Sequence, residues 1–273
     1  MENKLLKQRK EEVIEGFRDN TRHLSYSSLK EFAKSPSSFM QYQLRERVQT
    51  DAMMEGIIFH TLVLEPEKAK DKFYTDAEIV ASIGGAKPRA TKAYKEWRAQ
   101  QILERPKAIL IEAGKLQSLE QMANAVRFNP ASKKLLEGDG QNEMKLEFEY
   151  GGFKFKGAID RKTDDFIMDL KKTKDADPNR FKRDFFNLSY HIQSALYTIG
   201  NEEDLPYYVV AADSNMQVSV YEVGESLIQK GFEIIDNLLK DFKTCLEKGS
   251  FDDSYNFRGE KKGIYFIDTP PWL

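Results

Sequence analysis

The spacing of hydrophobic residues changes near the middle of the chain. In the first half, apolar residues recur at helical intervals. We expect a helix that a serine before Leu29 caps at its N-terminus, with Pro36 at its end or at the start of the next helix. Further helices are expected over 54–64, from near Thr91, and on both sides of Asn129-Pro130 within 115–136. From residue 146, apolar and polar residues alternate on both sides of Gly151-Gly152, which predicts a β-hairpin.

Strands and helices alternate in the second half. The elements expected after the hairpin are a strand with Asp169 and Lys171, a helix over 187–199 with Gly200 as its C′ residue, strands over 207–212 and 217–222, and a helix from about 225 to 248 that Gly249 ends. This order predicts an α/β fold with a central mixed β-sheet flanked by helices. We expect residues 1–22 to be a polar helical leader and residues 23–273 to form a single domain.

Composition narrows the class of protein. The 273 residues are 40% hydrophobic, which is enough for a sizeable core. No apolar run reaches the roughly 18 residues that a membrane span needs, and the charged N-terminus has no apolar signal core. Cys245 is the only cysteine, so a disulfide framework and a four-cysteine metal site are excluded within one chain. We therefore expect a cytoplasmic protein without a membrane contact.

The net charge of −2 and the pI of about 6.1 do not by themselves indicate a nucleic-acid-binding protein. Any contact with DNA must come from local basic patches. The richest patch is 87–107, where seven basic residues stand against two glutamates. A second patch follows the strand with Lys171. A charge run is usually a solvated helix face, so each patch has that interpretation as its alternative.

One hairpin carries the strongest chemical signal. If Asp164-Asp165 forms its turn, Asp160 lies opposite Asp169, with Cβ atoms about 4.5–5.5 Å apart. Two such carboxylates repel each other unless a cation lies between them. Lys171 follows on the same face of its strand. The pattern also fits a solvated hairpin face, but the apolar neighbours of Asp169 indicate a buried strand in which an acid needs a partner.

Four ordered motifs resemble the PD-(D/E)XK nuclease superfamily, and within it the RecE-type exonucleases (exodeoxyribonuclease VIII), from about Leu24 to the C-terminus. The matching segments are a histidine motif over 56–66, Gly157-Ala-Ile-Asp160, Asp169-Leu170-Lys171 and the Q-x-x-x-Y pattern from Gln193 to Tyr197; the segment 89–93 and the Pro270-Pro271-Trp272 ending also look like this family. Ala158-Ile159 depart from the residues that relatives often carry, but the carboxylate is kept.

The resemblance implies roles for the motif residues. His60, Asp160, Asp169 and the Leu170 carbonyl would hold a metal ion, and oxygen-rich ligation suits Mg²⁺, with Mn²⁺ as a substitute. Lys171 would position or help to deprotonate the attacking water, and Gln193 would lie near the terminal nucleotide. The pattern alone would make His60 a core histidine.

For other residues, the sequence gives weaker evidence of a role in the site. For Tyr197, ordinary packing competes with DNA contact, and His191 is interpreted as structural. Glu65 and Glu143 are weaker metal candidates, for which helix-end and strand-surface roles are favoured. We expect Trp97 to be buried. The residues expected to contact DNA are Arg89, Thr91, Lys92, Lys172, Lys174, Arg180, Lys182 and Tyr197; Ser27, Ser28 and Lys30 are expected to line the mouth of the site.

The motifs and the resemblance predict a metal-dependent deoxyribonuclease that digests one strand from double-stranded DNA ends. The resemblance implies 5′→3′ polarity, processivity, 3′ single-stranded overhangs for recombination, and a ring-shaped homo-oligomer, a trimer or tetramer. It also implies a single-strand annealing protein as a partner, and a bacterium or a phage-infected host as the source. Two alternatives stay open: a structure-specific endonuclease on the same fold, and a non-catalytic module that binds DNA ends.

Overall fold

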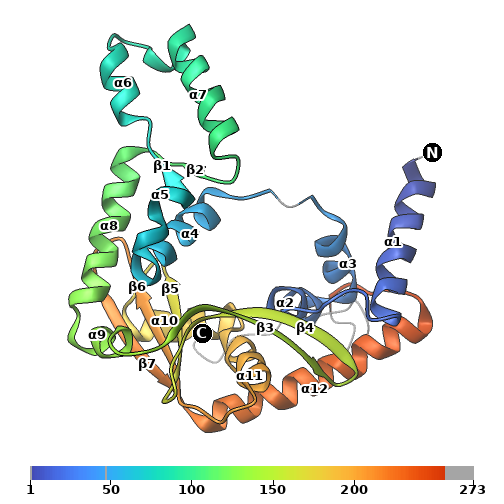
Figure 1. The fold of residues 1–273 in the computed structure, drawn as a ribbon. Helices are drawn as coiled ribbons and strands as arrows, with labels where there is room; N and C mark the ends of the chain where they lie inside the picture. Colours follow the sequence, from blue (N-terminus) through green and yellow to red (C-terminus); the bar gives the residue numbers. More distant parts are fainter. Residues whose placement is uncertain (1, 47, 256–273) are drawn as a thin grey trace, which may run out of the picture.

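A five-stranded mixed sheet, in the order β3-β4-β5-β6-β7, organises the chain (Figure 1). The computed structural model describes residues 2–46 and 48–255. The strands of this sheet are β3 (Gln141–Tyr150), β4 (Phe153–Lys162), β5 (Ile167–Lys172), β6 (Tyr207–Ala212) and β7 (Val218–Val223). β5 and β6 are parallel and the other neighbours are antiparallel. The predicted mixed sheet with flanking helices is confirmed.

The helices cover both faces of the sheet. They are α1 (Glu2–Arg18), α2 (Tyr26–Lys34), α3 (Pro36–Leu44), α4 (Asp51–Leu64), η1 (Pro66–Lys68), α5 (Ala69–Lys72), α6 (Ala77–Ile83), η2 (Pro88–Ala90), α7 (Lys92–Glu104), α8 (Ala113–Phe128), α9 (Pro130–Leu136), α10 (Pro178–Asn187), α11 (Tyr190–Asn201) and α12 (Glu225–Lys248). The predicted break at Asn129-Pro130 and the end of α12 at Gly249 are confirmed.

The central strand β5 separates two hydrophobic cores. Ile167 belongs to the core that also holds α2, α3, α11 and α12. Met168 and Leu170 point to the other face and pack in the core formed with α4 and α8. Because β5 is buried on both faces, a charged residue on it must find its partners inside the protein. This placement makes Asp169, with 2% of its surface exposed, a costly residue that calls for an explanation.

The hairpin of β3 and β4 forms at the predicted position. Tyr150 pairs with Phe153, and the two turn residues Gly151 and Gly152 have φ of 58° and 84°. Positive φ at both turn residues matches the twist of the strands, and glycine adopts it without steric cost. The turn therefore fixes the register of the whole hairpin down to Asp160.

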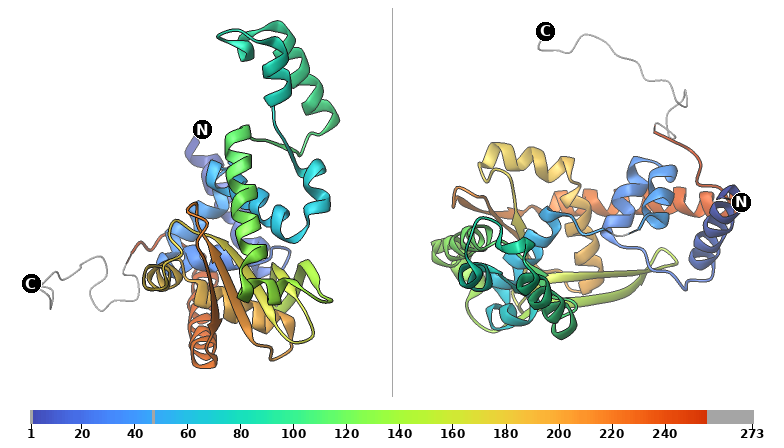
Figure 2. Two further views of the ribbon diagram at one scale, coloured as in Figure 1. Left: turned by 90° about the vertical axis from the view of Figure 1, so that its left-hand side faces the viewer. Right: turned by 90° about the horizontal axis from the view of Figure 1, so that it is seen from above.

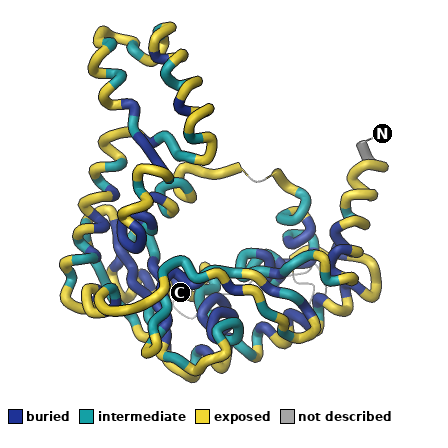
Figure 3. The backbone as a smooth tube through the Cα atoms, in the orientation of Figure 1, coloured by how far each residue is buried: buried dark blue, intermediate teal, exposed yellow. Residues whose placement is uncertain are grey.

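α6, η2 and α7 form an arm that projects away from the main sheet (Figure 2). A short parallel pair, β1 (Phe73–Tyr74) with β2 (Ile109–Leu110), lies at its base. The arm is mostly exposed, in contrast to the sheet (Figure 3). α7 begins after Thr91, as predicted, whereas α6, α10 and the β1–β2 pair were not predicted.

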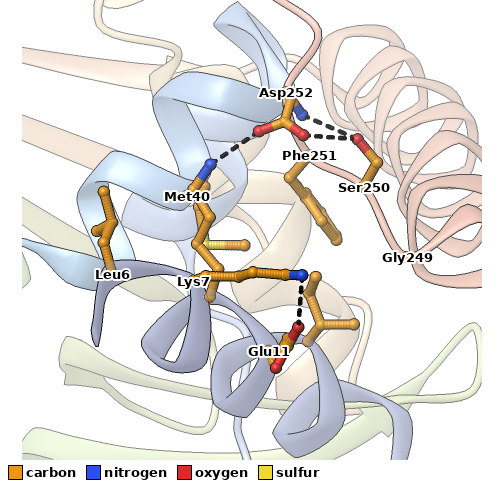
Figure 4. Close-up of a pocket in the computed structure, with 10 residues that line it drawn as sticks. Leu6, Lys7, Glu11, Met40, Gly249, Ser250, Phe251 and Asp252 are labelled. Carbon is orange, nitrogen blue, oxygen red and sulfur yellow. Dashed lines mark hydrogen bonds and ion pairs between the residues drawn. The ribbon is translucent and has the colours of Figure 1, made fainter. Parts of the chain in front are cut away.

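α1 is helical, as expected for residues 1–22, and its apolar side packs on the rest of the chain. Phe17 lies with its ring centre 5.5 Å from Phe39 and 5.4 Å from Phe242. Figure 4 shows the pocket between α1 and the segment after α12, where Lys10 forms a 2.8 Å ion pair with Asp252. The boundary at residue 23 stays a prediction.

The expected helix end at Gly200 is wrong. α11 continues to Asn201, and Glu202 adopts the left-handed conformation that ends it. Gly200 serves packing instead, because a Cβ there would lie 2.4 Å from the Phe148 ring. The Pro270-Pro271-Trp272 ending lies outside the described residues. None of the helices in the described part of the chain combines the length and hydrophobicity that a bilayer span requires.

Gly231→Ala is expected to destabilise the protein by about 1–3 kcal/mol, the usual cost of overpacking. Gly231 is where α12 approaches α11, and an added Cβ would lie 2.6 Å from the His191 carbonyl oxygen. Gly114→Ala is the matched control: it also lies in a helix but has nothing within 4 Å, so it should stabilise by about 1 kcal/mol. Urea unfolding of both variants measures the difference; equal stabilities would contradict this packing.

Candidate active site

The site forms where β4 and β5 separate. Their last recorded pair is Arg161 with Met168, and the register that it sets brings Asp160 across from Asp169, as predicted. The Thr163 N–H donates to the Phe166 carbonyl at 3.0 Å, so Asp164 and Asp165 form the turn. Beyond the last pair, the Asp160 carboxylate accepts the Leu170 N–H at 2.6 Å. A side chain thus occupies the gap between the two strands.

A cluster of three potential metal ligands lies on one side of this gap. His60 Nδ1 on α4 is 3.5 Å from Asp160 Oδ1 and 3.7 Å from Glu143 Oε1 on β3. One ligand atom from each of the three residues lies within 4.8 Å of the others. His60 is therefore not merely a core histidine: α4 brings it to the carboxylates.

Glu143 is the site residue that sequence reasoning undervalued. The pairs on either side of it place it in register with Asp160, and its φ of 51° is in the left-handed region. That conformation costs a non-glycine residue about 1–3 kcal/mol and is concentrated at functional sites. A signal was present in the sequence, because Glu143 and Asp160 are equally distant from the Gly151-Gly152 turn.

A second network joins β5 to α11. Lys171 Nζ lies 2.6 Å from Asp169 Oδ2 and donates to Gln193 Oε1 at 2.9 Å. Gln193 Nε2 in turn donates to Asp169 Oδ1 at 3.1 Å. Lys171 Nζ also lies 4.5 Å from the centre of the Tyr190 ring. The predicted convergence of Asp169 and Lys171 is thus present in the structure, and Gln193 bonds to both of them.

Burial and mutual attraction shift the pKa values of these groups in different directions. Burial disfavours the His60 imidazolium, yet attraction to Asp160 outweighs it and raises the pKa of His60 to about 10. Burial would raise the pKa of Asp160, but attraction to His60 keeps it below the ordinary value. Burial raises the pKa of Asp169 to about 6 against the attraction of Lys171. Burial opposes the charge on Lys171, but the two aspartates raise its pKa.

The donor set fits a divalent cation. Buried carboxylates with one imidazole are ligands that Mg²⁺ and Mn²⁺ accept, and no thiolate is near. Asp160 and Asp169 are 8% and 2% exposed, so their negative charges are withdrawn from water. In the structure, the positive charges that face them are the protein's own, from His60 and Lys171. A cation is therefore a suitable additional counter-charge for this group of acids.

Two predicted site residues are buried. Leu170 has no exposed surface and pairs with Val210 on β6. Tyr197 is 8% exposed, and a Cβ at Gly157 would lie 2.8 Å from its ring. Tyr197 therefore packs beneath the site, which is the alternative that its sequence context offered.

The predicted DNA contacts on the arm have partners within the arm. Arg89 binds Asp76 through two hydrogen bonds of 2.6 and 3.0 Å. The Thr91 hydroxyl caps α7 by accepting the Tyr94 N–H. Lys92 is 89% exposed beside Glu96. Trp97, expected to be buried, is half-buried.

The second basic patch lies beside β5 and along α10. Lys172 forms a 3.1 Å ion pair with Glu55, and Arg180 lies 3.3 Å from Asp175. Lys174 and Lys182 are exposed. Lys172 is the last residue of β5, the strand that carries Asp169 and Lys171.

Glu65 and His191, for which the sequence favoured structural roles, have surroundings that fit such roles. Glu65 ends α4 and pairs with Lys68 and, at 2.8 Å, with Lys72. His191 Nδ1 is buried without a hydrogen-bond partner among the described residues, and its ring lies 5.6 Å from that of Phe186.

A mixed sheet covered by helices, with an acid on one strand, a D-x-K pair on the next and a histidine helix beside them, defines a domain of the PD-(D/E)XK nuclease class. Residues 25–255 match the family model described as "PDDEXK-like domain of unknown function (DUF3799)". The chain belongs to this family, which confirms the predicted superfamily.

One solved structure has a similar fold over nearly the whole chain. A protein of Eubacterium rectale described as a "putative exonuclease" has 14% sequence identity and a TM-score of 0.58, with 92% of each chain covered. An alkaline exonuclease from Laribacter hongkongensis is 14% identical over 70% of this chain and 94% of its own, with a TM-score of 0.31. No curated protein matches the chain in sequence.

Metal binding is expected to strengthen as pH rises. Without metal, His60 holds its proton up to a pH of about 10, whereas a metal ligand must be deprotonated. The metal-bound state thus holds fewer protons, and apparent affinity should rise about tenfold per pH unit between pH 7 and 9. Below about pH 6, protonation of Asp169 weakens binding further. Mg²⁺ titration calorimetry across this range measures the slope; an affinity independent of pH would remove His60 from the ligands.

Proposed function

We propose that this protein is a metal-dependent deoxyribonuclease that hydrolyses phosphodiester bonds from the ends of double-stranded DNA. The observation that supports this most is the meeting of His60, Asp160 and Asp169 with Lys171 at the gap between β4 and β5. Hydrolysis of a phosphodiester needs a positioned water and stabilisation of charge on the phosphate. This site offers groups for both tasks.

The proposed ligands are His60, Asp160, Asp169 and the Leu170 carbonyl, and the structure adds Glu143 as a candidate. When bound, Mg²⁺ or Mn²⁺ supplies Lewis-acid stabilisation of charge on the phosphate. Asp160 is fixed by the Leu170 N–H, and Asp169 by Gln193, so both carboxylates are oriented before substrate arrives. This orientation lowers the cost of assembling the site.

Lys171 acts with its proton in place. Its raised pKa keeps the ammonium group charged, and a charged ammonium has only donors. It therefore orients the water or a phosphate oxygen and offsets the negative charge that develops, instead of accepting a proton. Gln193 holds Lys171 from the opposite side through its carbonyl oxygen. This hydrogen bond links β5 to α11 at the site.

The finer features follow the resemblance to RecE-type exonucleases. We propose 5′→3′ digestion that is processive and leaves 3′ overhangs for recombination, a ring-shaped homo-oligomer around the DNA, and a single-strand annealing protein as partner. The name of the Eubacterium rectale protein agrees with an exonuclease. We propose that Lys174 and Lys182, which are exposed, contact the DNA backbone without reading sequence.

The test is digestion of linear duplex DNA carrying a label at the 5′ or the 3′ end of one strand, in Mg²⁺ and in EDTA. A covalently closed circle is the control. Early loss of the 5′ label in Mg²⁺, with the circle intact, is expected. Cutting of the circle would favour the structure-specific endonuclease. Binding of ends without cleavage in any divalent metal would favour the non-catalytic module.

A further inference from the structure

Helix α2 brings a lysine to the edge of the metal centre. α2 packs against α11, the helix that carries Gln193. In the first turn of α2, the Tyr26 hydroxyl donates to the Leu188 carbonyl just before α11. Lys30 lies one turn further on the same helix face, with Nζ 5.4 Å from the centre of the Tyr26 ring. Lys30 therefore lies on the side of α2 that faces the start of α11, near enough to Lys171 for the two ammonium groups to repel each other.

Lys30 is a half-buried cation that has no counter-ion in the described part of the chain. No carboxylate lies within ion-pair distance of it in the described residues 2–46 and 48–255, and the neighbouring Glu31 binds Lys34 at 2.9 Å. In contrast, Lys171 and Lys172 have carboxylates at 2.6 and 3.1 Å. Removing a charge from water without pairing it costs free energy. An unpaired cation in such surroundings is suited to an anion that arrives from outside.

Electrostatics agree with this geometry. Burial lowers the pKa of Lys30; attraction to Glu31 opposes the shift, and repulsion by Lys34 and Lys171 adds to it. Lys30 and Lys171 each lie over a tyrosine ring, those of Tyr26 and Tyr190. Two like charges held near each other on aromatic supports are stabilised when a polyanion lies between them.

We propose that Lys30 binds a phosphate of the DNA strand being cut, adjacent to the phosphate that is hydrolysed at Asp160 and Asp169. This inference rests on the proposed function, because it assigns a substrate contact within the same site. Lysine binds phosphate as a point charge, so the contact holds the strand in place without selecting a base. Tyr26 is a positioning residue that fixes Lys30 relative to α11.

The first test is binding of a fluorescein-labelled duplex end in Ca²⁺, measured by anisotropy over a range of salt concentrations. Lys30→Met should weaken binding about ten- to a hundredfold, as for a lost hydrogen bond to a charged group. It should also reduce the slope of log Kd against log salt by about 1. Lys30→Arg should restore the slope. The matched control, Lys34→Met on the same helix, should keep the wild-type slope.

The second test locates the phosphate. A neutral methylphosphonate replaces, in turn, each of the first few phosphates from the duplex end. Wild type should lose affinity at the position that Lys30 contacts, and Lys30→Met should lose nothing more at that position. If the affinity lost through the methylphosphonate and the affinity lost through Lys30→Met add at every position, the assignment is overturned. The melting temperature of Lys30→Met should equal or exceed that of wild type, because an unpaired, half-buried charge is removed; a fall would indicate a structural role.

The two proposals fail in different ways. If wild type neither binds nor cuts duplex ends, the proposed function is wrong. If wild type cuts in Mg²⁺ and Lys30→Met matches it in KM, Kd and salt slope, only the assignment of Lys30 is wrong.

Discussion

Asp169→Asn is expected to lower cleavage of linear duplex DNA by about a thousandfold or more while the protein stays folded. The substitution keeps the shape of a side chain that is 2% exposed but removes the charge that would hold a cation. Loss of metal-assisted charge stabilisation costs several kcal/mol in the transition state, and each 1.4 kcal/mol is about tenfold in rate. Steady-state cleavage in Mg²⁺ and far-ultraviolet circular dichroism measure the two properties.

Asp165→Asn is the matched control for this prediction. Asp165 lies in the turn of the same hairpin, is exposed and carries the same charge. It should cleave DNA at the wild-type rate. Cleavage by Asp169→Asn within about tenfold of wild type would mean that the centre is not at β5.

Lys171→Met should reduce kcat by about a hundred- to a thousandfold, the usual effect of losing one donor that stabilises a developing charge. Metal affinity should not fall, because the ammonium lies 2.6 Å from Asp169 Oδ2 and repels a cation bound there. Lys171→Met therefore separates the reaction from metal binding, whereas Asp169→Asn lowers both. Rapid-quench cleavage and Mg²⁺ titration calorimetry give the two quantities.

Lys162→Met tests whether any half-buried lysine of the sheet would have the same effect. Lys162 lies at the end of β4 with 18% of its side chain exposed and pairs with Glu203 at 3.0 Å. Its loss should leave kcat unchanged. A kcat for Lys171→Met equal to that of Lys162→Met would contradict the role given to Lys171.

Turn chemistry made much of the site predictable from sequence. Two hairpin turns, Gly151-Gly152 and Asp164-Asp165, set the registers, and counting outward from the second one brought Asp160 across from Asp169. The same count from the first turn identifies Glu143, which a strand-surface interpretation had set aside. Local periodicity fixes which residues face each other on a hairpin, because side chains alternate strictly along a strand.

Contacts between segments that are distant in the sequence were harder to predict. Arg89 stands in a basic run, but its bond to Asp76 depends on how the arm folds, which the spacing of charges does not reveal. Glycine often follows the end of a helix, which made Gly200 look like such an end. In the structure, its lack of a Cβ makes room for the Phe148 ring, which comes from β3. α10 was missed even though Asp177 and Pro178 provide a cap and a first-turn proline.

Anomalous diffraction from crystals soaked in Mn²⁺ tests the metal centre most directly. The account predicts a strong peak at the gap between β4 and β5, within about 2.0–2.3 Å of an oxygen of Asp160 and of Asp169, with His60 or Glu143 nearby. Loss of that peak in Asp169→Asn crystals would agree with it. A peak at another acidic cluster, with none beside Asp160 and Asp169, would contradict it.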